Sequence, residues 1–190
     1  MMENKLHLKK TTWFTFILLT LFFTSCEVES SNVQQQSFFD INDFLKKEMT
    51  QLSEVRSIKK KVEINGKIDE QILEKFDLEK DLTIFRNSNI NKIAWLDKYD
   101  VDSTTNNSGQ LIELKYQATD PKLKTQQLII FYKEEKVNSI FIKNTSGNQV
   151  SELQQNLRYN SMKGYSVESN QKVTLSEEQK LKVEVIFLNN

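Results

Sequence analysis

The stretch 97–106, "DKYDVDSTTN", is the one place where side chains suited to binding a cation gather. Asp100, Asp102 and the threonine two residues further on have the spacing of the first three oxygen ligands in a helix–loop–helix calcium site. Such a site also needs a glycine for its sharp turn and a bidentate glutamate at its end, and the chain has Thr105 and Leu111 there. We therefore predict no metal site. A looser calcium site remains the minor alternative to a solvated loop.

Aromatic residues next to these acids give a second reason to single the region out. Trp95 and Tyr99 flank the loop, and aromatic rings on a sheet can stack against a sugar or a peptide. We take Trp95, Tyr99, Asp100 and Asp102 as the candidate ligand-binding residues. The alternative is that the rings fill the core and the acids are solvated.

Residues that carry nucleophilic catalysis are nearly absent. His7 is the only histidine and Cys26 the only cysteine. Beyond Cys26, the chain therefore lacks the parts for Ser–His–Asp or Cys–His catalysis, for thiolate or imidazole metal sites and for CxxC redox chemistry. The four glycines stand apart, so none forms a phosphate-binding loop. We predict a protein that is not an enzyme and has no cofactor, with a carboxylate-based hydrolase as the least favoured alternative.

Charge argues against nucleic acid as a partner. Lysine plus arginine and aspartate plus glutamate both total 26, so the formal net charge is zero. Binding to nucleic acid draws on a basic excess that displaces counterions. The sequence therefore predicts no nucleic-acid partner.

The N-terminal segment has the layout of a secretory signal. Lys5, Lys9 and Lys10 form a basic start, "WFTFILLTLFF" (13–23) is a short apolar run, and the small residues of "TSC" follow. A membrane-spanning helix needs about 20 apolar residues, roughly twice this run. We therefore predict a cleaved export signal.

"FFTSC" resembles the lipobox of bacterial lipoproteins, with Phe23 in place of the usual leucine. The resemblance implies that Cys26 becomes the first residue and carries acyl chains that anchor the protein in a membrane. Glu27 after the cysteine implies the outer membrane, on its periplasmic or its surface face. The acids of "CEVES" resemble the export tag of surface lipoproteins in Bacteroidota. "GYSVESNQKVTL" and "KVEVIFL" resemble uncharacterised lipoproteins of flavobacteria.

These features predict three segments. Residues 1–25 are the lipoprotein signal peptide, residues 26–37 are the acylated cysteine with a flexible tether, and residues 38–190 are a single domain. The tether is polar, and as a coil it would span on the order of 20 Å.

Helical patterns come first in the predicted domain. Asp40 is a good helix N-cap, Phe39 and Phe44 are placed for a hydrophobic staple, and an apolar stripe follows to Val55. A strand is expected over 58–64, ending at the turn "NG". One or two helices are expected within 69–88, with Asp69 and Asp77 as caps, and 89–109 is expected to be irregular.

From Gln110 onward, alternating apolar residues predict strands, with a hairpin turn at 134–136. The segment "SELQQNLRYN" (151–160) also fits a helix, although we favour a strand because Gly164 and "GYSVESNQKV" follow at hairpin distance. The resulting fold class is α+β, with N-terminal helices on one face of an antiparallel sheet formed mainly by the C-terminal half. The expected function is that of an outer-membrane lipoprotein that binds a protein or cell-envelope component. The alternative is a small-ligand or glycan-binding module.

Overall fold

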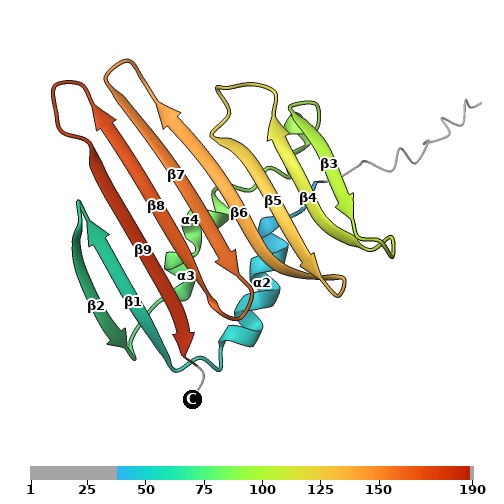
Figure 1. Cartoon of the computed structure of the whole chain (residues 1–190), viewed down its shortest axis with the longest axis horizontal. Coiled ribbons are helices and arrows are strands. Elements are labelled where there is room, and N and C mark those ends of the chain that lie inside the picture. Colours follow the sequence, from blue (N-terminus) through green and yellow to red (C-terminus); the bar gives the residue numbers. More distant parts are fainter. Residues whose placement is uncertain (1–37, 189–190) are drawn as a thin grey trace, which may run out of the picture. The chain divides into compact units, whose positions relative to one another are not determined.

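The computed structural model describes residues 38–188, which form one nine-stranded sheet with helices against one of its faces (Figure 1). The strand order is β2-β1-β9-β8-β7-β6-β5-β4-β3, and every neighbouring pair is antiparallel. The predicted signal peptide, the predicted acylation site Cys26 and the predicted tether lie outside the described residues. The strands are β1 (Ser57–Ile64), β2 (Lys67–Leu73), β3 (Tyr99–Thr105), β4 (Leu111–Ala118), β5 (Thr125–Lys133), β6 (Lys136–Gly147), β7 (Ser151–Asn160), β8 (Gly164–Val173) and β9 (Gln179–Leu188).

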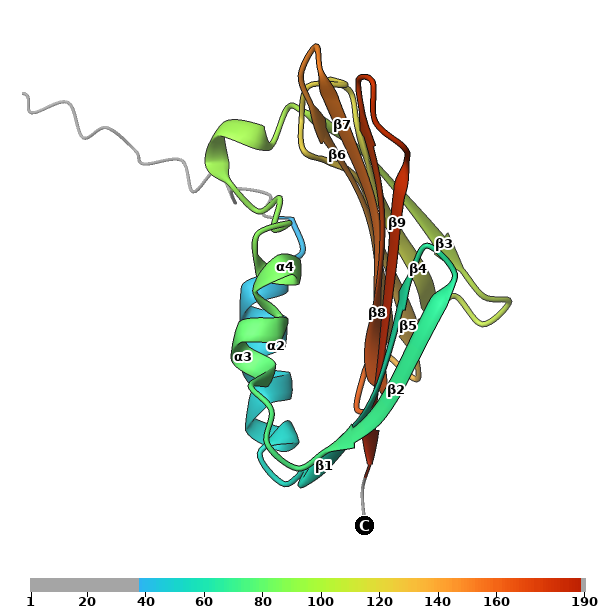
Figure 2. The ribbon, with the colours of Figure 1, turned by 90° about the vertical axis from the view of Figure 1, so that its left-hand side faces the viewer.

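The helical elements all lie on the same side of the sheet (Figure 2). One of them is a regular helix of 12 residues, and the others are single turns. They are α2 (Ile41–Leu52), α3 (Leu78–Asp81), α4 (Thr83–Arg86) and the 3₁₀ turn η2 (Ile93–Trp95).

The α+β fold class expected from the sequence is wrong. Of the residues that the structure describes, 54% lie in strands and 15% in helical elements, so the fold is mostly β and built on a single sheet. The sequence predicted a helix where edge strand β2 lies, and irregular chain where the other edge strand, β3, lies. The helices expected within 69–88 shrink to the two single turns α3 and α4.

The sequence did not predict strand β2 because neither of its two faces is a buried apolar face. Ile68 and Ile72 are exposed, and β2 pairs only with β1. Its position is set by the turn before it, where Asn65 and Gly66 both have positive φ, 48° and 84°. Such a turn suits a two-residue β-hairpin, so the chain after Gly66 returns along β1. Asp69 accordingly lies within a strand and caps no helix.

Strand β3 was missed because it is polar. Only Tyr99 of its residues is buried, and the remaining six are exposed. β3 is held as a strand by its pairing with β4, and its own composition does not indicate a strand.

The structure confirms the cap and the staple that the sequence predicts for the first helix, α2. The Asp40 carboxylate accepts hydrogen bonds from the backbone N–H of Asn42 (2.8 Å) and Asp43 (3.2 Å). The rings of Phe39 and Phe44 lie 5.8 Å apart, as a staple requires. Asp77 likewise caps α3 by accepting from the N–H of Lys80 at 3.0 Å.

The core lies between the helices and one face of the sheet. Alternate residues of each strand point toward the helices, so the same rows of side chains are buried across neighbouring strands. The opposite face carries no helix of the described residues, as the sideways view shows (Figure 2). The residues that join strands to helices in this core are Ile58, Tyr99, Tyr116, Leu128, Ile130, Ile140, Ile142, Leu157, Tyr159, Tyr165, Val167, Val185, Phe187 and, from α2, Ile41, Leu45 and Leu52.

Candidate binding surface

Tyr99, one of the four residues singled out from the sequence, belongs to the core. Its hydroxyl donates a hydrogen bond of 2.8 Å to the backbone carbonyl of Thr125. Burial raises the pKa of Tyr99 to about 12. Its ring packs against Phe38 at 5.8 Å between centroids. Tyr99 is therefore a structural residue and faces no ligand site.

Asp100 and Asp102 point the other way. They alternate with Tyr99 and Val101 along β3, so their side chains lie on the opposite face of the edge strand, where both are exposed. Asp102 accepts a hydrogen bond from the N–H of Ser103 at 2.9 Å. In the part of the chain that the structure describes, no group of three or more acidic, histidine or cysteine side chains could hold a metal ion.

The Trp95 side chain packs toward the core and does not face these acids. It is half-buried in η2, packs against the core, and has the Lys92 ammonium 3.9 Å above its ring centroid. Such a cation–π contact stabilises a lysine over an aromatic face. The four predicted residues therefore do not converge on one site.

The other tyrosines of the sheet also face the helices. Tyr116 accepts from the N–H of Phe39 at 3.0 Å, and Tyr165 donates to the Asp81 carboxylate at 2.6 Å. Burial raises the pKa of Tyr116, and burial together with the hydrogen bond to Asp81 raises that of Tyr165. These rings fill the interior, so they form no sugar-binding platform on the open face.

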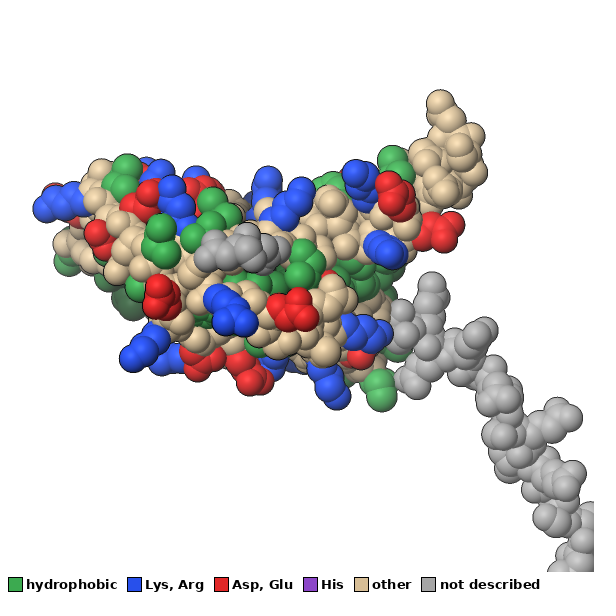
Figure 3. Space-filling view, turned by 90° about the horizontal axis from the view of Figure 1, so that it is seen from below, with side chains coloured by type: hydrophobic (Ala, Val, Ile, Leu, Met, Phe, Trp, Pro, Cys, Tyr) green, Lys and Arg blue, Asp and Glu red, His purple; other side chains and the backbone are tan. Residues whose placement is uncertain are grey.

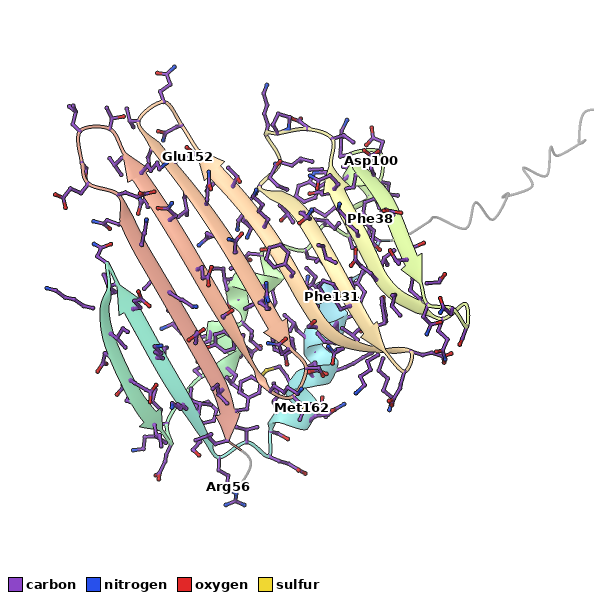
Figure 4. All side chains as sticks on the ribbon, viewed as in Figure 1. Phe38, Arg56, Asp100, Phe131, Glu152 and Met162 are labelled. Carbon is purple, nitrogen blue, oxygen red and sulfur yellow. The ribbon has the colours of Figure 1, made fainter. Side chains whose placement is uncertain are left out.

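The open face of the sheet is the surface that a partner could reach. Figure 4 looks onto this face and labels Phe131 on β5. The register places Ile129 beside Phe141, in a row flanked by Lys115 on β4 and by Arg158 on β7. Phe131 lies in the neighbouring row, between Glu113 on β4 and Ser139 on β6. Ile129, Phe131 and Phe141 are half-buried by their neighbours. An apolar strip thus crosses β5 and β6. Further exposed apolar side chains on this face are Ile186 of β9 and Ile68 and Ile72 of β2.

A hollow of about 590 Å³ lies next to this strip, over β7, β8 and β9. Gly164 is part of its lining, at a point where β8 and β9 approach closely. With φ of +146°, Gly164 has a conformation that other residues rarely adopt, and a Cβ there would collide with the Val185 carbonyl oxygen. The lining residues are Phe141, Asn156, Leu157, Arg158, Asn160, Lys163, Gly164, Tyr165, Ser166, Glu168, Lys182, Glu184, Val185 and Ile186.

Charges of both signs surround the hollow. The Lys182 ammonium lies 3.1 Å from Glu184 and 3.3 Å from Glu168. Its hydrogen bonds to Glu184 and then to Glu168 raise the pKa of Lys182. The Arg158 guanidinium stands 5.5 Å from the ring centroid of Phe141. The hollow therefore offers hydrogen bonds and one aromatic wall to a polar partner.

The sequence did not indicate this surface. Alternation in 126–144 and 181–188 showed that strands were present, although it did not show which strands are neighbours. Phe141 meets Arg158, and Glu168 meets Lys182, only through pairings of β6 with β7 and of β8 with β9. The lysines and glutamates that gather here are interspersed along the sequence, and the same mixture of signs covers the lower end of the molecule (Figure 3).

Comparison with known proteins gave no match to a protein-family model, to a curated protein or to a solved structure. Within residues 38–188, none of the helices has the length and the apolar character needed to cross a membrane.

Proposed function

We propose that the chain is a lipoprotein, anchored by acyl chains on Cys26 to a bacterial outer membrane, whose folded part binds a protein or another envelope component without catalysis. The observation that carries the proposal is the position of the only cysteine. Cys26 ends the sequence "FTSC", directly after a basic start and the apolar run 13–23. Two or three acyl chains anchor a protein stably, whereas one gives reversible binding.

The open sheet face supports binding by the folded part. Antiparallel sheets commonly pack one face on a core and leave the other in water. In this sheet the second face has an apolar strip, defined by Ile129, Phe131 and Phe141, beside the hollow at Arg158. Both edge strands carry acids, Asp69 and Glu70 on β2 and two more on β3, which discourages a partner from adding a strand. We therefore assign binding to the open face.

A protein partner is favoured over a glycan. The hollow has the volume of a small-ligand pocket. Its only aromatic wall is Phe141, because the Tyr165 ring faces the helices. A hydrolase is disfavoured as well, since Lys182 stands within 3.3 Å of both Glu168 and Glu184 and occupies the space that a substrate between these acids would need.

Acyl labelling tests the anchor. The full chain is produced in a Gram-negative host supplied with a clickable fatty acid, together with the variant Cys26→Ser. The original chain should be labelled and recovered with outer membranes, and the variant should be unlabelled and released. Equal labelling and equal membrane recovery of the two chains would overturn the proposal.

Charge reversal tests the open face. The anchored protein is captured from detergent-solubilised envelopes in three forms: the original, Arg158→Glu, and the control Lys136→Glu. Lys136 is exposed at the β5–β6 turn, away from the hollow. A specific partner should be recovered with the original and the control and be lost with Arg158→Glu. Identical recovery by all three forms would remove the open face from the proposal.

A further inference from the structure

One end of the sheet, which we call the loop edge, gathers four connecting segments. Figure 1 shows the β4–β5, β6–β7 and β8–β9 connections together at the upper end of the strands. Backbone hydrogen bonds join these segments to one another or to an adjoining strand end. They run from Thr119 N–H to Lys98 (3.0 Å), from Thr145 N–H near the end of β6 to Lys124 (2.8 Å) and from Thr174 N–H to Val150 (2.9 Å). The loop edge consists of residues 91–98, 119–124, 148–150 and 174–178.

Three large apolar side chains of the loop edge are exposed. Leu175 is fully exposed, Ile93 is 76% exposed and Val150 is 59% exposed. Leu175 also has φ of +66°, a left-handed conformation that glycine or asparagine adopts at lower cost than leucine. A leucine at this position gains no packing within residues 38–188 and carries a backbone cost. Contact with an apolar medium outside the chain would compensate for both.

Basic and aromatic groups accompany these apolar side chains. Lys92, Lys122 and Lys124 are exposed on the loop edge, and Trp95 lies under the Lys92 ammonium. Lysine stems, tryptophan rings and exposed aliphatic side chains are the groups that proteins place at the boundary between lipid headgroups and acyl chains. Lysine also gains from the negative charge of anionic lipid. The loop edge also carries four acids, which equal its four lysines in number. Asp97 pairs with Lys98 at 3.1 Å, and Glu178 lies 3.8 Å from both Lys172 and Lys180. Asp120 and Glu177 are the other two acids, so the lysines act as local contacts for lipid phosphates and the loop edge as a whole has no basic excess.

The described part of the chain also begins at this end. The Phe38 ring packs against Tyr99 and Tyr116, at 5.8 Å and 5.1 Å between centroids. Tyr99 pairs with Ala118, the last residue of β4 before the β4–β5 connection of the loop edge. Eleven residues separate Cys26 from Phe38, and at full extension they reach no further than about 40 Å. An anchor at Cys26 therefore keeps the domain within about 40 Å of the bilayer, and the chain enters the domain at the end that carries the loop edge.

We propose that the loop edge lies on the bilayer surface, with its three exposed apolar side chains in the headgroup region and its three exposed lysines beside lipid phosphates. This inference rests on the lipid anchor proposed above and adds a direct contact between the folded domain and lipid. The strands then stand with one end on the membrane, and the open face is left accessible from the side.

A fluorescent label at Leu175 tests the contact. In the acylated mature chain Cys26 has no free thiol, so Leu175→Cys introduces the only reactive one. The labelled, acylated protein is placed in vesicles of phosphatidylethanolamine and phosphatidylglycerol that contain a lipid-borne quencher. The matched control is Ser108→Cys, exposed in the β3–β4 connection at the opposite end of the strands. We expect a blue-shifted emission and severalfold stronger quenching at 175 than at 108.

The outcomes separate the two proposals. Equal quenching at 175 and 108 would show that the domain stays clear of the lipid, and it would overturn the contact while leaving the anchor intact. A blue shift at 175 without quenching by lipid would mean that protein covers the loop edge, which also overturns it. If the acylated chain does not stay with the vesicles, the anchor has failed and the contact fails with it.

Discussion

The hydroxyl of Tyr159 donates a hydrogen bond of 2.9 Å to the carboxylate of Glu48, and this bond joins strand β7 to helix α2 inside the core. The Ser161 hydroxyl lies 2.9 Å and 3.0 Å from the two oxygens of the same carboxylate. Glu48 is buried, and a buried carboxylate is tolerated only when hydrogen bonds replace those it made to water. Tyr165 and Asp81 repeat the arrangement between β8 and α3. Tyrosine–carboxylate pairs thus attach the helices to the sheet.

Removing one of these hydroxyls should destabilise the fold. In Tyr159→Phe the ring still fills its place, whereas Glu48 loses a donor and keeps only Ser161. We expect the free energy of unfolding in urea to fall by about 1–3 kcal/mol, the cost of an underpaired buried acceptor. The control is Tyr132→Phe, because the described residues provide no hydrogen bond to the Tyr132 hydroxyl. Equal losses in the two variants would contradict this role of Glu48.

High pH should unfold the protein. Burial raises the pKa of Tyr99 to about 12 and raises those of Tyr159 and Tyr165 further, whereas an unfolded tyrosine ionises near pH 10. Above pH 10 the unfolded chain therefore binds fewer protons than the folded one, and stability falls as the pH rises. Each tyrosine that stays neutral in the fold contributes a slope of about 1.4 kcal/mol per pH unit. The contribution of Tyr99 is complete below pH 10 and is lost as the pH approaches 12.

Tyrosinate absorbance checks this expectation. In a native sample the absorbance should stay low through pH 10 and then rise together with the loss of near-ultraviolet circular dichroism. In urea all five tyrosines should titrate near pH 10. Ionisation of several tyrosines at pH 10 in a chain that remains folded would disprove the buried hydrogen bonds.

The N-cap of α2 should contribute more to the free energy of unfolding than the N-cap of α3. Besides its two backbone donors, the Asp40 carboxylate accepts from the side-chain amides of Asn89 (3.0 Å) and Asn91 (3.2 Å). It therefore holds the 87–92 connection against the start of the helix. Asp40→Ala should lower the free energy of unfolding by about 2 kcal/mol, the upper end for a cap. Asp77→Ala, which removes a single backbone contact, should cost about half as much. A larger effect at Asp77 would refute the comparison.

Local sequence patterns were sufficient to predict those helices and strands that bury one side in the core. The cap at Asp40, the stripe of α2 and the alternation of the later strands all follow from one buried side per element. The turn at 134–136 was also anticipated, and Glu134 and Glu135 there have positive φ, as a tight hairpin turn requires. The segment 151–160 is a strand, as favoured because Gly164 and a further strand pattern follow it at hairpin distance.

The sheet edges and the site required knowledge of pairing. Strands β2 and β3 have one neighbour each, so partner strands rather than their own composition fix them. Reading 99–105 as irregular chain also misplaced the site. As a strand, this segment sends Tyr99 to the core and Asp100 and Asp102 to the opposite face, so the three could not share a ligand. The hollow at Gly164 joins residues from four strands, and no local pattern predicts it.

Gly164 offers the sharpest test of the strand packing beneath the hollow. A Cβ at this position would meet the Val185 carbonyl group and would also stand 3.1 Å from the Cα of Ile186. Backbone atoms cannot move aside as a flexible side chain can, so the two strands would have to separate. We expect Gly164→Ala to lower the free energy of unfolding by about 3 kcal/mol or more. The control is Gly109→Ala, where φ is +77° and nothing lies within 4 Å, so only backbone strain of about 1 kcal/mol is added. If urea denaturation gave the two variants the same stability, the close approach of β8 to β9 at Gly164 would be refuted.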